Sequence, residues 1–295
     1  MKIPYKTVVI VYNPNSTGDG LKNAKKLAEE IKERSDLNVH LEETSHPGHA
    51  TKIAKEWIQK KTPVLLISSS GDGGYNELVS GVLELGSPNH VYVAVIPSGN
   101  ANDHANSMQS RTLIDSIIFP RSTEMDALSI VITPKNGTKT TKYAHSYAGI
   151  GLTAYIGKKL TKADLNPFNE KWLVIKYLLS FRRVKVSVDG GRRRYSSLVF
   201  GNIDRMSKVI TLGNSTSVTD GKMEVYSIRY RSLARIMFWL LVGSTLGLKE
   251  DKKCKVFELK TLNEIDMQVD GESFKIKADS KVRVSCNPKA LKTIL

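Results

Sequence analysis

Residues 64–77, VLLISSSGDGGYNE, join an apolar run to a loop of small residues. The run at residues 64–67 is typical of a strand buried on both faces of a parallel sheet. Three serines and three glycines around Asp72 follow it, and we expect Asn76 and Glu77 to begin a helix. Glycine lets a loop backbone approach an anion, and a helix N-terminus favours negative charge. The segment therefore predicts a strand, a ligand-binding loop and a helix.

Strand and helix signals alternate across the first 120 residues. Apolar runs predict strands at residues 8–12, 37–41, 64–67 and 91–96, and helical spacing of apolar residues predicts helices at 21–31, 50–58 and 78–83. This alternation predicts a doubly wound parallel sheet. After Pro120, short period-two runs predict an antiparallel β-sandwich or open barrel. We therefore predict an α/β plus β chain, with an α/β domain at residues 1–124 completed by the tail 287–295, and a β-sandwich domain at residues 125–286.

The charge of the chain favours an anionic partner. Its 44 Lys and Arg residues against 29 Asp and Glu residues give a formal net charge of +15. The basic residues are scattered and no RNA-binding aromatic signature is present, so we do not expect nucleic acid as a partner. A phospholipid surface or a phosphorylated ligand fits the charge better.

Compartment signals indicate a cytoplasmic protein. Cys254 and Cys286 have no CxxC spacing and make no disulfide framework. The N-terminal apolar run is too short for a signal peptide. The longest apolar stretch, residues 236–242, is well short of the roughly 20 residues that span a bilayer. We expect at most a peripheral association with membranes.

Three loops follow predicted strands, at residues 13–18, 68–74 and 97–103, where ligands bind in open parallel sheets. Each combines glycine with hydroxyl or amide side chains. One such loop is common in any α/β protein, but three together favour a phosphate site.

No GxxxxGK[ST] loop is present, which excludes a P-loop NTPase. The GxGxxA match at residues 149–154 lies in the β-rich half without a suitably spaced acidic residue, and His46 and His49 flank a turn instead of forming a metal site.

Several motifs together resemble the catalytic family of diacylglycerol kinases, which includes bacterial soluble lipid kinases and the sphingosine and ceramide kinases. The motifs are Asn13-Pro14, Thr44 with residues 47–50 (PGHA), residues 71–77 (GDGGYNE), 97–103 (PSGNAND), 146–151 (SYAGIG), 219–225 (TDGKMEV) and 269–272 (VDGE). Each motif alone is weak evidence for the family. Together, in this order and spacing, the motifs extend over essentially the whole chain.

The resemblance implies a kinase that transfers the γ-phosphoryl group of ATP to a lipid hydroxyl with Mg²⁺, diacylglycerol being the leading substrate. It implies that residues 1–124 bind the nucleotide and residues 125–286 bind the lipid. The implied nucleotide-binding residues are Asn13, Thr44, Ser70, Gly71, Asp72, Gly73, Gly74, Asn76, Glu77, Ser98, Gly99 and Asn100. Asp72 would act on the phosphates through Mg²⁺, and Glu272 would be the general base. Asp220 would bind a structural Mg²⁺ with backbone carbonyls, and Asn102 and Asp103 would join that metal to the active site.

Some alternatives remain open at this point. The family loops read Gly-Gly-Asp-Gly-Thr and Pro-x-Gly-Thr-x-Asn-Asp, whereas this chain has Ser70, Gly74 and Asn100 in place of Gly, Thr and Thr. The chain is therefore either an active kinase of diacylglycerol or of another lipid, or a catalytically weak or inactive relative that binds nucleotides or membranes. Without the resemblance, Asp270-Gly271 is simply a hairpin turn. NAD kinase activity is disfavoured, because its family does not supply the late DGE and DGKM pair.

Basic side chains next to apolar segments are candidates for membrane contact. The candidates are Lys158, Lys159, Arg182, Arg183, Lys185, Arg192, Arg193, Arg194, Arg229, Arg231 and Arg235. The helix predicted at residues 236–241 is either interfacial or packed in the core, and we favour the core. The apolar segment 172–179 either walls an acyl-chain pocket or packs on the sheet. A homodimer through an edge strand is compatible with the sequence, although no residue pattern requires it.

Overall fold

A computed structural model describes residues 3–16, 18–99, 102–108, 111–155, 183–206, 210–213, 216–229 and 233–294. The chain divides into two compact units. The first comprises residues 1–127 and 288–295, and the second comprises residues 128–287. The predicted fold class, an α/β part followed by an antiparallel β part, is confirmed.

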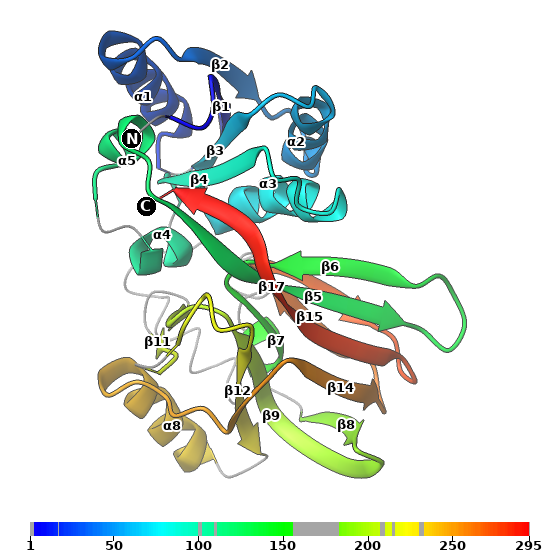
Figure 1. Cartoon of the computed structure of the whole chain (residues 1–295). Helices are drawn as coiled ribbons and strands as arrows, with labels where there is room; N and C mark the ends of the chain where they lie inside the picture. Colours follow the sequence, from blue (N-terminus) through cyan, green and yellow to red (C-terminus); the bar gives the residue numbers. More distant parts are fainter. Residues whose placement is uncertain are drawn as a thin grey trace. The chain divides into compact units, whose positions relative to one another are not determined.

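The first unit is built on a parallel sheet (Figure 1). Its elements are β1 (Thr7–Tyr12), α1 (Gly20–Arg34), β2 (Asn38–Glu43), α2 (His49–Gln59), β3 (Val64–Ser70), α3 (Asp72–Glu84), β4 (Val91–Pro97), α4 (Asp103–Met108) and α5 (Leu113–Ile118). The strands lie in the order β2-β1-β3-β4, and Thr293 near the end of β17 (Lys281–Ile294) pairs in parallel with Val93 of β4.

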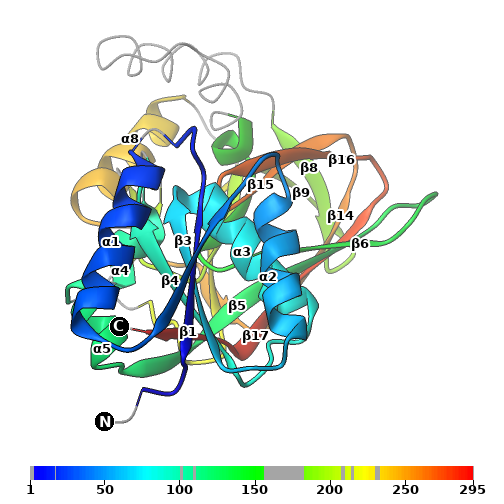
Figure 2. The ribbon, with the colours of Figure 1, turned by 90° about the horizontal axis from the view of Figure 1, so that it is seen from above.

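The strand order reverses between β1 and β3. From β1 the chain goes outward to β2 and then returns to β3 on the other side. Figure 2 shows α1 on one face of this sheet and α2 with α3 on the other. Because such a reversal leaves a crevice at the carboxyl ends of the flanking strands, it is the expected ligand position in an open α/β sheet. The fold thus points to the ends of β1 and β3.

Apolar residues on both faces of the sheet hold the first unit together. Val8, Ile10, Leu65 and Ile67 are fully buried and pack with the apolar face of α1. The burial of β1 and β3 on both faces explains their unbroken apolar sequences. Strand β2 has no buried residue and lies at the sheet edge, which explains its alternating sequence.

The second unit is antiparallel in all the strand pairs that the structure describes within residues 128–287. Its elements are β5 (Ser122–Thr133), β6 (Thr140–Ala144), β7 (Tyr147–Gly151), β8 (Val184–Val188), β9 (Gly191–Gly201), β10 (Arg205–Met206), β11 (Ile210–Thr211), β12 (Met223–Arg229), α8 (Leu233–Thr245), β13 (Lys252–Cys254), β14 (Val256–Thr261), β15 (Ile265–Val269), β16 (Glu272–Ile276) and the first part of β17. The order β16-β15-β7-β9-β8-β14-β17 makes one continuous path. Phe200 and Phe257 meet edge to face in its core.

Helix α3 begins earlier than the sequence predicts. We expected it to begin at Asn76, but the helix begins at Asp72, directly after the strand that contains Ser68, Ser69 and Ser70. Pairing with β4 extends β3 to Ser70, which lies opposite Pro97. This tertiary pairing overrides the weak strand propensity of serine and leaves Gly71 alone as the connection.

None of the described helices combines the length and the apolar character that crossing a membrane requires.

Candidate functional site

A cavity of about 290 Å³ lies at the carboxyl ends of β1, β2 and β3, where the strand order reverses. Its lining residues are Val11, Tyr12, Asn13, Asn15, Thr44, Ser45, His46, Pro47, Ala50, Ser68, Ser70, Gly74 and Glu77. All of them belong to the first unit. The cavity therefore occupies the ligand position that the topology predicts.

Five of the predicted nucleotide-binding residues line this cavity: Asn13, Thr44, Ser70, Gly74 and Glu77. Their positions are set by backbone contacts between neighbouring strand ends. The N–H of Thr44 and its hydroxyl both donate to the Tyr12 carbonyl, at 2.9 and 3.2 Å. The Asn13 side chain accepts from the Asn15 N–H at 2.9 Å, which folds the loop after β1 into a tight turn.

The other predicted residues of these loops that the structure describes do not line the cavity. Asn76 is buried within α3, and Ser98 is fully buried. The Ser98 hydroxyl accepts from the Asn23 amide at 2.9 Å, and its carbonyl accepts from the Gly18 N–H and the Ser16 hydroxyl. Ser98 thus ties the loop after β4 to the loop after β1. Asn100 lies outside the described residues.

Gly71 and Gly99 bring the loops after β3 and β4 into backbone contact. A Cβ atom on Gly99 would overlap the Gly71 Cα, and one on Gly71 would lie 3.1 Å from the Gly99 Cα. Asn102 folds the second loop, because its side chain accepts from the Gly99 N–H and donates to the Gly99 carbonyl, both at 2.9 Å. These glycines are required by close packing of the two loops.

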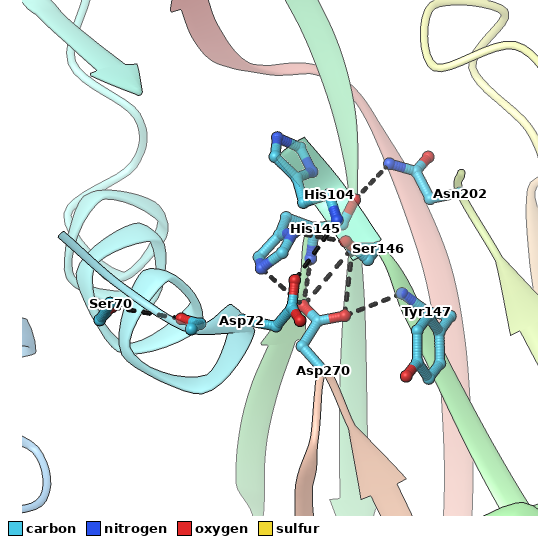
Figure 3. A network of polar contacts seen from close by, with 9 residues as sticks. Ser70, Asp72, His104, His145, Ser146, Tyr147, Asn202 and Asp270 are labelled. Atoms are coloured by element: carbon cyan, nitrogen blue, oxygen red, sulfur yellow. Dashed lines mark hydrogen bonds and ion pairs between the residues drawn. The ribbon is translucent and has the colours of Figure 1, made fainter. Parts of the chain in front are cut away.

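Asp72 links the starts of two helices. It is the first residue of α3, and its carboxylate accepts from the backbone N–H of His104 in α4 at 3.3 Å (Figure 3). The rings of Tyr75 and His104 pack at 4.8 Å alongside this contact. Asp103, the predicted network residue, is buried at the start of α4. The aspartate predicted to act on phosphates is thus held rigidly beside the cavity loops.

Two helix N-termini are the features at this cavity that favour an anion. Among its described lining residues, none is lysine or arginine. However, α2 and α3 both begin at it, and neither has a side-chain cap on its N-terminal N–H groups. The helix dipole and the N–H groups of a first turn favour an anion at such an end. The Tyr12 hydroxyl donates to the Glu43 carboxylate at 3.0 Å, and partial desolvation together with this hydrogen bond raises the pKa of Tyr12 above its ordinary value.

Glu272, the predicted general base, lies in the second unit directly after a two-residue turn. Asp270 and Gly271 have φ angles of +43° and +93° and join β15 to β16, with Val269 opposite Glu272. This is the hairpin turn that Asp-Gly sequences favour. The structural and catalytic interpretations of the motif are therefore compatible. The Glu272 carboxylate lies 3.7 Å from the Lys142 ammonium, and both side chains are partly exposed.

Asp270 anchors that turn to the start of β7 (Figure 3). Its carboxylate is buried and accepts from the N–H groups of His145, Ser146 and Tyr147 at 2.7, 3.2 and 2.8 Å. The His145 ring lies 3.4 Å from the same carboxylate and 2.7 Å from the Ser146 hydroxyl. The contacts run from Ser146 to His145 to Asp270, as in a Ser-His-Asp triad. All three side chains are buried, however, so no substrate reaches them. The Asp-Gly sequence predicts a turn but gives no sign of this positioning role of Asp270.

Replacing Asp270 with asparagine is expected to lower the free energy of unfolding by about 2–3 kcal/mol, because a carboxylate that accepts several buried N–H groups loses its charge. Asparagine tolerates a positive φ, so the backbone itself is not strained. Urea unfolding checks this result. Asp189→Asn is the matched control: Asp189 and Gly190 form the equivalent turn between β8 and β9, with φ angles of +52° and +75°, but Asp189 is exposed. Equal losses in both variants would contradict the anchoring role.

The metal site predicted at Asp220 stays a prediction. Its carboxylate accepts from the Lys222 N–H at 3.0 Å and lies 4.0 Å from the Lys253 ammonium, which also contacts the buried Glu224 at 3.0 Å. Burial raises the pKa of Glu224, while Lys253 opposes that shift. In the part of the chain that the structure describes, no group of three His, Cys, Asp or Glu side chains is arranged to hold a metal ion. Side chains alone therefore do not make a site at Asp220, and backbone carbonyls would have to complete it.

Comparisons with known proteins agree with the sequence motifs. A family model, the diacylglycerol kinase catalytic domain, matches residues 7–130. A diacylglycerol kinase of Staphylococcus aureus (strain bovine RF122 / ET3-1) is 25% identical over 283 residues, which cover 90% of this chain and 86% of the relative. A crystal structure of a diacylglycerol kinase from Bacillus anthracis str. Sterne has a TM-score of 0.69 at 18% identity, over 99% of this chain and 98% of that one. The predicted resemblance is confirmed, and with it the enzyme class of lipid kinase.

Proposed function

Because the chain carries the diacylglycerol kinase catalytic domain over residues 7–130, we propose that it transfers the γ-phosphoryl group of ATP to a lipid hydroxyl. Diacylglycerol is the leading substrate, and the product is then phosphatidic acid. The nucleotide enters as its magnesium complex, so that Mg²⁺ arrives with the substrate. The observation that carries the proposal is the cavity at the strand reversal, with the N-termini of α2 and α3 at its wall.

The transfer step needs positioning and charge neutralisation more than covalent help from the protein. In the proposed step the lipid hydroxyl oxygen forms a bond to the γ-phosphorus, and the bond from the γ-phosphorus to the β,γ-bridging oxygen breaks. The hydroxyl proton goes to the Glu272 carboxylate, and ADP leaves. The first turn of α3 supplies N–H groups for the phosphates, and Asp72 acts on them through the magnesium that the nucleotide carries.

A lipid panel tests the proposal. Purified protein is incubated with γ-labelled ATP and Mg²⁺ and with mixed vesicles that contain diacylglycerol, ceramide or sphingosine, and NAD is supplied in a further arm. The expected result is label in phosphatidic acid. Label in NADP would replace the lipid assignment by NAD kinase activity. Folded protein that labels no lipid in any arm would overturn the proposed function.

Helix α8 supports a proposal for how such an enzyme meets its substrate. One side packs inward through Ile236 and Trp239, as expected for a helix packed in the core. The other side leaves Phe238 66% and Leu241 60% exposed. Phe238 lines a groove of about 660 Å³, whose wall also contains Arg229, Lys249 and Asp251. Apolar side chains flanked by cations suit an anionic bilayer surface.

Several of the remaining basic candidates lie on the paired strands β8 and β9 or, like the exposed Arg183, directly before β8. Arg192, Arg193 and Arg194 are exposed on β9, and Lys185 of β8 lies opposite Arg194. Lys158, Lys159, Arg182, Arg231 and the segment 172–179 lie outside the described residues, as does the side chain of Arg235. We propose helix α8 as the membrane-contact surface, because exposed apolar side chains lie near cations there.

Replacing Phe238 and Leu241 with serine is expected to lower the partition coefficient onto anionic phosphatidylglycerol vesicles about tenfold or more, because two exposed apolar side chains no longer enter the interface. Vesicle co-sedimentation measures this change. Phe119→Ser is the control, since Phe119 is also 56% exposed but lies in the first unit. Unchanged binding of the double variant, or an equal loss in the control, would contradict the assignment to α8.

A further inference from the structure

Ser70 and Gly74 lie on adjoining elements and line the same cavity. Ser70 is the last residue of β3 and is 5% exposed, while Gly74 lies in the first turn of α3. They are also two of the positions where this chain differs from the Gly-Gly-Asp-Gly-Thr pattern, which has glycine at the first and threonine at the second. The family pattern thus has a hydroxyl at position 74, and this chain has one at position 70.

The two positions share one space. A Cβ atom on Gly74 would overlap the Ser70 Oγ and lie 2.8 Å from the Ser70 Cβ. Real Cβ atoms essentially never lie within 3.0 Å of such neighbours. The Ser70 Cβ is fixed by the backbone of β3, which pairs with β4 through residue 70. This backbone therefore accommodates a side chain at position 70 or at position 74, but not at both.

The Ser70 hydroxyl is oriented by its neighbours and still has capacity for a ligand. It lies 2.6 Å from the Ser68 hydroxyl, and it donates to the Gly71 carbonyl at 3.2 Å. When Ser68 donates to Ser70, a phosphate oxygen in the cavity competes only with this long hydrogen bond to the Gly71 carbonyl for the Ser70 proton. Ser68 lines the cavity as well. A pair of coupled hydroxyls therefore faces the space at the start of α3.

We propose that Ser70 supplies the hydroxyl that the family loop carries at position 74, and that it donates to a phosphate oxygen of the bound nucleotide. The serine at position 70 then compensates for the missing threonine at position 74. The loop still presents one hydroxyl, but from the end of β3 instead of from the first turn of α3. The ligand assignment rests on the proposed function, whereas the steric coupling does not depend on it.

A double-mutant cycle tests both parts. The variants are S70G, G74T and S70G/G74T, with S70A and S70A/G74T added to separate the hydroxyl from the Cβ. The free energy of unfolding is measured without nucleotide, and the affinity for ATP with Mg²⁺ is measured by calorimetry without lipid. If G74T does not fold, G74A replaces it, because its Cβ is the overlapping atom.

S70A is expected to weaken nucleotide binding about three- to tenfold, the loss of one hydrogen bond, with little change in stability. G74T is expected to lose both stability and affinity. S70G/G74T, which has the family pattern, is expected to regain stability and to bind within about twofold of the wild type. S70A/G74T is not expected to recover, because the 2.8 Å Cβ contact remains.

Additive losses in S70G/G74T would overturn the steric coupling. Wild-type affinity in S70A would overturn the role of the hydroxyl on the nucleotide. A wild-type protein that does not bind ATP would overturn the ligand assignment together with the proposed function. In that case the stability cycle, measured without nucleotide, still decides whether the two positions are coupled.

Discussion

Replacing Glu272 with glutamine is expected to lower the turnover number for lipid phosphorylation by about 10²- to 10⁴-fold, which is the usual contribution of a general base. Glutamine keeps the size of the side chain but does not accept the hydroxyl proton. The turn before it stays anchored, because the Asp270 carboxylate holds the N–H groups of His145, Ser146 and Tyr147. The affinity for ATP is expected to change little, because the residues that line the nucleotide cavity all belong to the first unit.

Glu264→Gln is the matched control for this variant. Glu264 is an exposed glutamate at the other end of the same hairpin, and its contact is an ion pair with Lys275. Steady-state rates with mixed vesicles, together with calorimetric ATP affinity, compare the two variants. A Glu272→Gln enzyme within about threefold of the wild-type turnover would contradict the base assignment, since a base contributes about 10²-fold or more.

Asp72→Asn is expected to lower turnover by about 10²- to 10³-fold, which is typical when one preorganised electrostatic group of a transition state is removed. Asparagine retains the oxygen that accepts from the His104 N–H, so the link between α3 and α4 survives. It removes the negative charge that, in the proposed mechanism, Asp72 would present to nucleotide-bound magnesium. We therefore expect ATP affinity to become less dependent on Mg²⁺ concentration.

Turnover at saturating ATP and calorimetric affinity across a magnesium titration measure this effect. Asp36→Asn is the control, because Asp36 is an exposed aspartate between α1 and β2, away from the lining of the cavity. A variant that keeps the wild-type magnesium dependence while losing turnover would assign Asp72 a purely structural role. Wild-type turnover in Asp72→Asn would remove it from the mechanism.

Strong periodic signals in the sequence predicted most of the first unit. The unbroken run at residues 64–67 marked β3, because a strand buried on both faces needs no polar alternation. The start of α3 was missed by four residues. Its first turn consists of Asp72, Gly73 and Gly74, whose intrinsic preference is against a helix, and the packing of α3 on α2 and β3 outweighs that preference.

Site residues at strand ends could be predicted from the sequence. Site residues whose side chains are positioned by packing against other loops could not. Asn13, Thr44 and Ser70 line the cavity because each lies at or just after a strand end. Ser98 has the same chemistry but is turned into contacts with Asn23 and Ser69, which single-sequence patterns do not encode. The burial of Asp270 could not be predicted either. An exposed Asp-Gly turn, as at Asp189, and a buried one, as at Asp270, have the same sequence.

Strand β17 imposes an order on the assembly of the nascent chain. Its residues 281–287 belong to the second unit, while residues 288–294 return to the first, where Thr293 pairs with Val93 and Ile294 enters the core. Until residues 288–294 have been synthesised, one edge of β4, with the sequence VYVAVIP, has no strand to pair with. An unpaired apolar edge is a template for association between chains. The first unit is therefore translated first, but its sheet is completed last. During synthesis of the second unit, the nascent chain exposes an unpaired, aggregation-prone edge of β4.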